Sequence, residues 1–592
     1  MRRSKLFFSI ALAALSFACS GEFVEQETWP GKPRRGGAQP EPGPGSEPQP
    51  GDPTPPPAGP SGGSAPGEVV SPPLPPPSRP AVCQEVKLAP RGLRRLTGPE
   101  LEATVRAAFS LSEAEWSGPQ LLPDPASADG FTNNQARLEI GEEYAKRWLE
   151  NAKTLSDTIT APNLLLRVAP CALQGGEACA RSYLDTVGKR LYRRPLDDAE
   201  KARYVDLLRK VEVGGDFKQW VYWATVALLG SPSTLYRSEL GEKVGDRYRL
   251  TGSELASALS YTYTGGPPSE ALLDLAATGR LETKEQIEAA ARELVVLPTG
   301  HVQPGFRQLF RRFADQWLGL SPLANLSKDK TVFPQFTPEI QDALGQETTR
   351  FLEHVVFEEK GTAADLLTAP YTSVDSKLSA YYGFGQVAPG TFNRVQRPAG
   401  WGVGLLAQGS ILALAANNTH TSPTKRGHLV RERILCTKVP PPPAVVEQLP
   451  EPTAGKTTRE RYESLHAAAD GCKGCHALMD PIGFAFEHLD AAGRYREREG
   501  QYPIDASGAV TGTSAGELRF DGPAELGQAL ARLPEAAECM GNFFAAYSFG
   551  IDRDEALCMA GEAGVALGQG GLPLVEFFVR LAGADSFRFR AP

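Results

Sequence analysis

The sequence predicts a mainly α-helical, multidomain body with minor β elements, preceded by a disordered, proline-rich stalk. Three observations lead to this prediction. Apolar residues recur at helical spacing from about residue 88 onward, whereas sustained period-two alternation is scarce. The 592 residues exceed what one hydrophobic core usually holds. Residues 30–80 contain 19 of the 51 prolines, and such a segment buries too little apolar surface to fold.

The start of the chain is typical of an export signal. Three basic residues among the first five precede the apolar run Leu6–Phe17, which is too short to span a bilayer. Cys19 follows this run as the lipid-carrying cysteine follows the apolar region of a bacterial lipoprotein signal, although Leu15 lies one position too far upstream. We therefore expect a signal peptide over residues 1–19 with lipidation at Cys19, and ordinary cleavage nearby is the alternative.

The segment 20–87 is predicted to be an extended linker that holds the folded body away from a membrane surface. The expected location is extracytoplasmic, at the cell envelope or the outer membrane surface. The lipid anchor is the only membrane contact that we expect. The net charge of −8 provides no broad basic face, so no nucleic acid partner is expected.

Helices are predicted where apolar residues recur every three to four positions. The first one, Thr97–Ser110, begins with Thr97 and Glu100 at capping-box spacing. The further predicted helices are Tyr183–Leu191, Asp197–Val211, Gln219–Leu229, Gly252–Tyr263, Glu282–Val295, Gly305–Leu318 and Pro338–Phe357. The few stretches that favour strands are Phe392–Val395, Tyr502–Val510 and Glu517–Phe520. A second proline run, Pro440–Pro443, predicts a rigid spacer before the segment that carries the most specific motif.

That motif is C-K-G-C-H at residues 472–476, which is typical of a c-type haem attachment site. Two cysteines at this spacing can bond the two vinyl groups of haem, and the next histidine can ligate the iron. We expect Cys472 and Cys475 to carry the thioethers and His476 to be the proximal iron ligand of one haem c per chain. The alternatives are a Cys472–Cys475 disulfide and a zinc site. The disulfide lacks a thioredoxin-like context, and the zinc site lacks a second ligand pair.

The distal iron ligand is left open. His420 lies in a loop-like stretch upstream, where a histidine is usually solvated. Met540 follows His476 by 64 residues, in an apolar helical pattern where core packing is the alternative. Met479 lies one turn after His476, on the same side of the iron, and is expected to pack against the haem edge. An open sixth position is a further possibility, and this choice separates electron transfer from ligand chemistry.

The residues that follow the motif have expected roles of their own. Pro481 is expected to end the haem-binding turn, and Gly483 to permit close backbone approach. Phe484 and Phe486 are suited to covering the porphyrin, or else they are core residues after a simple turn. A backbone carbonyl of this segment is expected to accept the hydrogen bond of His476 Nδ1, which would orient the ring.

Six cysteines remain once Cys19 and the motif are assigned. An even number in an exported chain indicates up to three disulfides. Local spacing favours Cys171 with Cys179 and Cys539 with Cys558, and Cys83 with Cys436 then follows by elimination.

Beyond the motif, residues 472–496 resemble the C-terminal region of planctomycete-type secreted cytochrome-like proteins, which are built from consecutive domains of unknown function. Other stretches resemble the domains of this family in the same order. They are Leu93–Thr97, Leu122–Pro123 and Gly130–Phe131 for the first domain; Tyr192–Leu196, Ser231–Pro232 and Leu235–Arg237 for the second; Leu255–Tyr261, Gln316–Leu318, Glu347–Thr348 and Tyr382–Gly383 for the third; Thr421–Pro423, Arg426–Gly427 and Pro440–Pro443 for the fourth; and Gly522–Tyr547 for the last.

The resemblance implies a series of domains after the linker. The expected divisions are 88–165, 166–245 and 246–390 for three helical domains, 391–512 for a cytochrome c-like haem-bearing domain, and 513–592 for a C-terminal helical domain. It also implies secretion and a cytochrome-like character, but no substrate. The chain departs from the family at Ser260–Thr264, where relatives often have a Ser-Tyr-Phe-Leu-Trp run. A shared function of that helix face is therefore in doubt.

Three functions are compatible with these features. The preferred one is extracytoplasmic electron transfer with a redox partner protein of unknown identity, because haem is the only redox-capable group indicated. The second is a haem-dependent oxidoreductase or its electron-accepting subunit, with residues 88–390 shaping a cleft. The third is a surface binding or scaffold protein with structural haem or a disulfide in its place. The sequence contains no G-x-S-x-G, H-E-x-x-H or phosphate-loop motif, so no catalytic residue is named.

Overall fold

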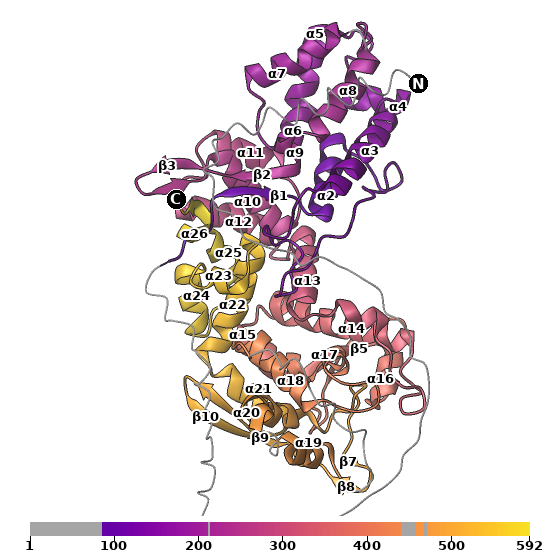
Figure 1. The fold of residues 1–592 in the computed structure, drawn as a ribbon, viewed down its shortest axis with the longest axis vertical. Coiled ribbons are helices and arrows are strands. Elements are labelled where there is room, and N and C mark those ends of the chain that lie inside the picture. Colours follow the sequence, from indigo (N-terminus) through magenta and orange to yellow (C-terminus); the bar gives the residue numbers. More distant parts are fainter. Residues whose placement is uncertain (1–85, 211–212, 440–455, 467–469) are drawn as a thin grey trace, which may run out of the picture. The chain divides into compact units, whose positions relative to one another are not determined.

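The structure is a computed structural model of the chain, and it describes residues 86–210, 213–439, 456–466 and 470–592 (Figure 1). The predicted signal peptide with Cys19, nearly all of the predicted stalk, Cys83 and the proline run 440–443 lie outside the described residues. No helix in the described ranges combines the length and the apolar character needed to cross a membrane. The prediction of a mainly α-helical body with minor β elements is confirmed.

The first part of the described chain is a group of helices beside one two-stranded sheet. Strand β1 (Gly92–Arg95) pairs antiparallel with β2 (Tyr236–Glu239), with Gly92 opposite Glu239. The helical elements between these strands are α2 (Gly98–Phe109), α3 (Glu142–Ile159), α4 (Pro162–Val168), α5 (Gly176–Tyr183), η1 (Leu184–Gly188), α6 (Lys189–Tyr192), α7 (Asp198–Val205), η2 (Asp206–Arg209), α8 (Phe217–Leu229) and α9 (Pro232–Leu235).

The start of α2 confirms the capping box that the sequence predicts. The Thr97 side chain accepts from the Glu100 backbone N–H at 3.3 Å, and the Glu100 carboxylate accepts from the Thr97 N–H at 2.8 Å. These two bonds satisfy backbone donors that a helix start leaves open. The same arrangement begins α7 with Asp197 and Glu200. These two helix starts are therefore encoded locally.

The middle of the chain continues with helices, and it contains a hairpin that the sequence analysis did not predict. Its elements are β3 (Glu242–Val244), β4 (Arg247–Arg249), α10 (Gly252–Thr264), α11 (Glu270–Ala277), α12 (Lys284–Val295), α13 (Pro304–Trp317), η3 (Ser321–Asn325), α14 (Pro338–Glu353), η4 (His354–Glu358), α15 (Ala363–Thr368), β5 (Tyr371–Val374) and α16 (Ser376–Tyr382).

The motif-bearing part follows. Its elements are β6 (Asn393–Gln396), η5 (Leu405–Ala407), α17 (Gly409–Leu414), α18 (Pro423–Leu429), η6 (Val430–Ile434), α19 (Thr458–His466), α20 (Asp470–Gly483), η7 (Phe484–Phe486), β7 (Arg498–Glu499), β8 (Tyr502–Pro503), β9 (Ser507–Thr513) and β10 (Gly516–Asp521). Strands β6, β8, β9 and β10 overlap the stretches predicted as strands. The antiparallel pairs are β5 with β6, β7 with β8, and β9 with β10.

The chain ends in a helical group drawn in yellow in Figure 1. Its elements are α21 (Gly522–Ala531), α22 (Pro534–Phe549), α23 (Arg553–Ala556), α24 (Gly561–Gly568), α25 (Leu574–Ala582), α26 (Asp585–Arg588) and β11 (Phe589–Arg590). Strand β11 pairs with β4, with Arg590 opposite Tyr248, so the last residues return to the middle of the chain. Helix α25 also packs on α12.

Buried apolar residues form two clusters. One is built from residues between 96 and 235, and Tyr261 of α10 joins it. The other extends from Leu250 to Phe587 and also takes in Ala89 and Phe131 from the start of the described chain. The elements of the middle, the motif-bearing part and the C-terminal group therefore share one continuous core.

Candidate functional site

The C-K-G-C-H motif lies in helix α20, and α18 packs directly against this helix. A Cβ atom on Gly427 of α18 would lie 1.9 Å from the backbone oxygen of Met479. A Cβ atom on Gly483 of α20 would lie 1.9 Å from the backbone oxygen of Pro423. The two helices thus touch backbone to backbone, which only glycine permits at these positions. The close approach expected at Gly483 is present, and Gly427 is its counterpart on α18.

Helix α20 does not end where proline was expected to end it. Pro481 lies inside the helix, which continues to Gly483 and then tightens into η7. The helix is held there by the buried Arg431 of η6, which donates from Nε to the Leu478 oxygen at 3.0 Å and from Nη1 to the Thr511 oxygen at 2.7 Å. The Leu478 carbonyl accepts this bond in the turn that precedes Pro481, and the helix continues through Pro481, so the expectation that Pro481 ends the haem-binding turn is wrong.

The chain just after α20 is anchored by Arg426. This arginine of α18 is 2% exposed, and it donates to the backbone oxygens of Phe486 at 2.7 Å, Leu489 at 2.8 Å and Asp490 at 2.8 Å. Burial lowers the pKa of the Arg426 guanidinium to about 10, so it stays charged at neutral pH. Arg426 therefore fixes the path of the chain from α20 through η7.

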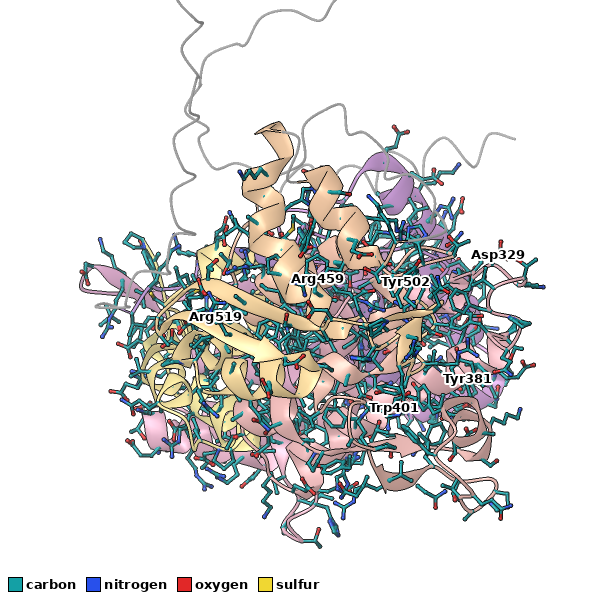
Figure 2. All side chains as sticks on the ribbon, turned by 90° about the horizontal axis from the view of Figure 1, so that it is seen from below. Asp329, Tyr381, Trp401, Arg459, Tyr502 and Arg519 are labelled. Atoms are coloured by element: carbon teal, nitrogen blue, oxygen red, sulfur yellow. A yellow bond between two sulfur atoms is a disulfide. The ribbon has the colours of Figure 1, made fainter. Side chains whose placement is uncertain are left out.

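The β9–β10 hairpin and α19 complete the surroundings of this helix. A Cβ atom on Gly508 of β9 would lie 2.0 Å from the Pro481 oxygen. Arg459 of α19, labelled in Figure 2, donates to the Ser507 oxygen at 2.7 Å and lies 4.7 Å from the Phe484 ring centroid. Phe484 and Phe486 are 3% and 2% exposed. Their rings are buried within the protein here, in accordance with the alternative that they are core residues.

The histidine of the motif belongs to a small polar group. His476 Nδ1 lies 3.1 Å from Asp480 Oδ2 and 3.3 Å from Thr424 Oγ1, and Thr424 donates to Asp480 Oδ1 at 2.6 Å. An ionised carboxylate only accepts, so the Asp480 contact places the ring proton on Nδ1. The partner of Nδ1 is thus a carboxylate and not the backbone carbonyl that we expected. The spacing i, i+4 on one helix face is the sequence signal that could have identified Asp480.

The cysteines of the motif are described in part. Cys475 is half-buried and carries a free thiol. The side chain of Cys472 lies outside the described residues. Since Cys475 forms no disulfide, the alternative of a Cys472–Cys475 bond is not present in this structure. Among the described residues there is also no group of three or more His, Cys, Asp and Glu side chains that could hold a metal ion.

The two candidates for the distal ligand lie in different settings. His420 is in a tight connection before α18, where Nε2 contacts Asn417 Nδ2 at 2.8 Å and Nδ1 contacts Thr419 Oγ1 at 2.9 Å. The buried Lys328 donates to the Asn417 oxygen at 2.8 Å and fixes this connection. Met540 is 4% exposed and packs in the core from α22. Iron ligation by either residue stays a prediction.

Three aromatic rings, from Trp401, His488 and Tyr495, stack on one another in the motif-bearing part. Trp401, labelled in Figure 2, stacks on Tyr495 with centroids 5.5 Å apart, and Tyr495 stacks on His488 at 5.6 Å. Tyr381, also labelled there, donates to the Ala492 oxygen at 2.9 Å. These contacts hold residues 488–495, which follow the motif helix, against the rest of the protein.

The disulfides differ in part from the expected pairing. Cys171 is bonded to Cys179, the local pair that spacing favours. Cys436 is bonded to Cys539 across 103 residues, so the expected pairs Cys539–Cys558 and Cys83–Cys436 are wrong. Packing of η6 against α22 brings Cys436 and Cys539 to a Cα–Cα distance of 5.3 Å, which sequence separation does not reveal. Cys558 is also disulfide-bonded.

Three domain families match consecutive parts of the chain. They are described as PSD5, a protein of unknown function (DUF1595), over residues 179–239; PSD4, a protein of unknown function (DUF1592), over residues 250–384; and PSCyt3, a protein of unknown function (DUF1588), over residues 403–499. They match the planctomycete-type family with several such domains. The third range contains α18, α20 and the whole C-K-G-C-H motif. No curated protein and no solved structure matches the chain significantly.

Proposed function

We propose that this chain, with its three consecutive domains of unknown function, is an exported cytochrome-like protein that transfers single electrons outside the cytoplasm. The single observation that supports this most is the hydrogen bonding of His476 within the C-K-G-C-H helix. A histidine that ligates a metal through one ring nitrogen commonly donates the other N–H to a carboxylate, and His476 Nδ1 faces Asp480.

The donor set fits a c-type haem. Cys475 has a free thiol one position before His476, and the spacing to Cys472 is that of a thioether pair. When bound, a c-type haem supplies a one-electron iron centre. Cys472 and Cys475 would hold it covalently, and His476 would ligate the iron through Nε2. Asp480 and Thr424 keep the Nδ1 proton in place, which makes the imidazole a stronger ligand.

The helix that would carry the haem is rigid on its protein side. Contacts of Gly427 and Gly483 and the hydrogen bonds from Arg431 fix its position without the cofactor. A fixed ligand geometry suits electron transfer, because little needs to rearrange between oxidation states. The lipid on Cys19 would hold the protein at the cell envelope, within reach of a redox partner protein.

The test is covalent haem attachment in the full-length, exported protein. Wild type is expected to stain for haem on a denaturing gel and to show one haem c per chain in the reduced-minus-oxidised spectrum. The double variant Cys472→Ala/Cys475→Ala is expected to lose both signals. The double variant Cys171→Ala/Cys179→Ala removes two cysteines elsewhere and is the matched control that keeps them. A wild type without covalent haem would refute the proposal.

The same spectrum, recorded with carbon monoxide and for the variant His420→Ala, tests the sixth ligand of the iron. Slow or absent carbon monoxide binding to the reduced protein is expected of a six-coordinate electron carrier, whereas rapid binding favours ligand chemistry. A spectrum unchanged by His420→Ala would exclude His420 as the sixth ligand.

The Asp480→Asn variant tests the proposed role of the carboxylate. Loss of the carboxylate is expected to make His476 a weaker ligand of the iron and to favour the reduced state. The midpoint potential of the haem is then expected to rise by tens of millivolts, which is about a tenfold change in the ratio of reduced to oxidised iron. Potentiometric titration of the haem-loaded protein measures this shift. Glu497→Gln, an exposed carboxylate in the same part of the chain, is expected to leave the potential unchanged. Equal potentials for Asp480→Asn and wild type would exclude this role.

A binding or scaffold lipoprotein is the second candidate, and the disulfides favour it. Cys436–Cys539 connects the segment just after η6 to α22 covalently, and Cys171–Cys179 and the bonded Cys558 add further crosslinks. Such bonds stabilise an exported body independently of any cofactor. This candidate predicts a folded, fully crosslinked wild type that carries no haem after export.

A further inference from the structure

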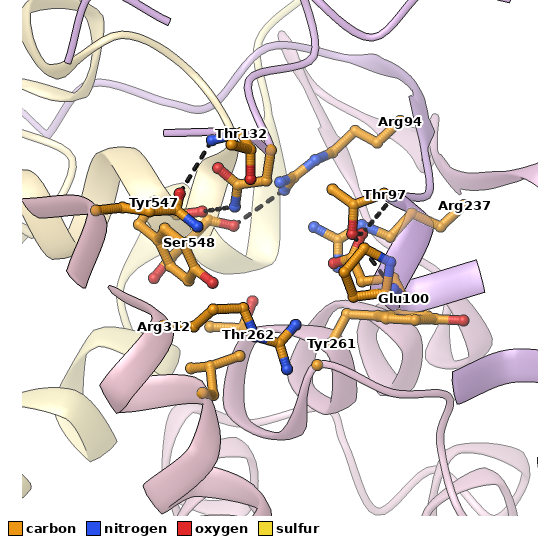
Figure 3. A pocket seen from close by; sticks show the side chains of 15 residues that line it. Arg94, Thr97, Glu100, Thr132, Arg237, Tyr261, Thr262, Arg312, Tyr547 and Ser548 are labelled. Atoms are coloured by element: carbon orange, nitrogen blue, oxygen red, sulfur yellow. Dashed lines mark hydrogen bonds between the residues drawn. The ribbon is translucent and has the colours of Figure 1, made fainter. Parts of the chain in front are cut away.

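A second site lies away from the motif helix, where several separate stretches of the chain meet. It is a pocket of about 450 Å³, including its open mouth. Its lining comes from β1, the start of α2, residues 132–133, β2, α10, α13 and α22 (Figure 3). Pockets at such junctions are common positions for small ligands.

Positive charge dominates this pocket. Figure 3 shows Arg94, Arg237 and Arg312 reaching toward the same space from three different elements. Glu100 is the acidic residue of the lining, and its carboxylate already accepts from the Thr97 backbone and hydroxyl at 2.8 and 3.0 Å. The pocket therefore has more guanidinium groups than carboxylates.

The one carboxylate behind the pocket, on Glu239, does not neutralise the excess of positive charge. Arg94 and Arg237 share Glu239 with a third arginine, Arg590, and all four side chains are at most 8% exposed. Arg94 Nη1 lies 3.2 Å from Glu239 Oε1, and Arg237 Nε lies 3.3 Å from the same atom. One carboxylate for three buried guanidinium groups leaves positive charge without a buried counter-ion, which is costly.

Some side-chain donors of the pocket, on Arg237 and Arg312, have no acceptor among the described residues. Arg237 is 4% exposed, and its Nη1 is buried without a hydrogen-bond partner. Arg312 is half-buried, and its guanidinium forms no hydrogen bond or ion pair with any residue in the described ranges. Burial raises the pKa of Tyr547 to about 12 although Arg312 opposes this, so the Tyr547 hydroxyl remains a neutral donor. Arg237 Nη1 and the Arg312 guanidinium therefore have no anionic acceptor among the described residues.

We infer that this pocket binds a small oxyanion, namely a carboxylate, sulfate or phosphate group, between Arg237 and Arg312. Guanidinium groups match the oxygens of such anions, and charge-assisted hydrogen bonds are the strong ones in proteins. The pocket has room for a group of this size. A bound anion would also connect β1, β2, α13 and α22, so binding would stabilise the junction of these elements.

The experiment measures anion binding to the full-length protein at constant ionic strength. Phosphate, sulfate and acetate are titrated separately by calorimetry, with sodium chloride as the reference, and thermal unfolding is followed in the same buffers. Saturable binding of at least one of the three oxyanions and a rise of the melting temperature are expected. Which anion binds most tightly identifies the group that the pocket prefers.

Arg312→Gln is the decisive variant, because Arg312 has no partner in the described part whose loss would disturb folding. It is expected to weaken oxyanion binding about tenfold or more. Arg311→Gln is the matched control on the same helix. Arg311 Nε forms an ion pair with Glu353 Oε1 at 2.5 Å. In the control variant, Glu353 still has an ion pair with Arg307, whose Nη1 lies 3.1 Å from Oε2. The control is expected to bind like wild type. The inference is overturned if wild type binds none of the three oxyanions, or if the two variants bind with equal affinity.

Discussion

Gly427→Ala is expected to destabilise the motif-bearing part of the protein by about 3 kcal/mol or more. The added Cβ would lie 1.9 Å from the Met479 oxygen and 2.6 Å from its carbonyl carbon. Backbone atoms cannot rotate away as a side chain does, so α18 and α20 must separate. Separation would also strain the hydrogen bonds that Arg426 and Arg431 donate to the backbone around α20.

The measurement is the free energy of unfolding in urea, followed by near-ultraviolet circular dichroism. Gly345→Ala is the matched control, because Gly345 is also a helical glycine, and its added Cβ would meet only Leu323 Cδ2 at an ordinary 3.4 Å. The control is expected to be neutral or to stabilise by about 0.5–1 kcal/mol through helix propensity. A Gly427→Ala protein as stable as this control would contradict the contact between the helices.

Glu239→Gln is expected to cost about 3–5 kcal/mol, because it leaves three buried guanidinium groups without their shared carboxylate. Arg590 donates to Glu239 Oε2 at 2.6 and 2.9 Å, and Arg94 donates to Oε1 at 3.2 Å. These bonds connect β2 to β11 and β1, so their loss should loosen both of these strands at once. Urea unfolding of the variant and wild type measures the difference.

The same carboxylate predicts an acid dependence. Burial raises the pKa of Glu239, but Arg590, Arg94 and Arg237 outweigh burial and hold it at about 2, below the ordinary 4.5. A lowered pKa means that this stabilisation is complete above pH 4.5 and is lost as the pH falls from 4.5 toward 2. Wild type should therefore lose stability over this range, and Glu239→Gln should lack this component.

Glu242→Gln is the control for both measurements. Glu242 is an exposed residue of β3, and it has no ion pair within the described residues. Its replacement should leave both the free energy of unfolding and the acid dependence as in wild type. Equal stability of Glu239→Gln and Glu242→Gln would exclude a stabilising role of the arginine cluster.

Much of the secondary structure follows from local signals. The capping box of Thr97 and Glu100, the periodicity that predicts α10 and α14, and the alternation in β9 and β10 all act over a few residues. Strands β1 to β5 escaped prediction, because three or four residues rarely show a period; β6 has the same length and was nevertheless indicated. Their hydrogen-bond partners are remote in sequence, as for β1 with β2.

The candidate haem site also has a part that local sequence reveals and a part that depends on remote residues. The thioether cysteines and the proximal histidine are contiguous, so the sequence identifies them without a structure. Thr424 lies 52 residues before His476 and contacts it only because α18 packs on α20. Asp480 lies one turn after His476 on the same helix, so its i, i+4 spacing is a local signal that sequence reasoning could have used.

By itself, the sequence determined the helical class, the capped helix starts and the C-K-G-C-H motif, because each depends on residues close together in the chain. The export signal is read from local residues in the same way, and it stays an expectation. Only the tertiary structure decided the pairing of Cys436 with Cys539, the glycine contacts between α18 and α20, and the arginine pocket. Each of these needs residues that are separated by tens to hundreds of positions. Their proximity arises from burial of a continuous core, which has no local code.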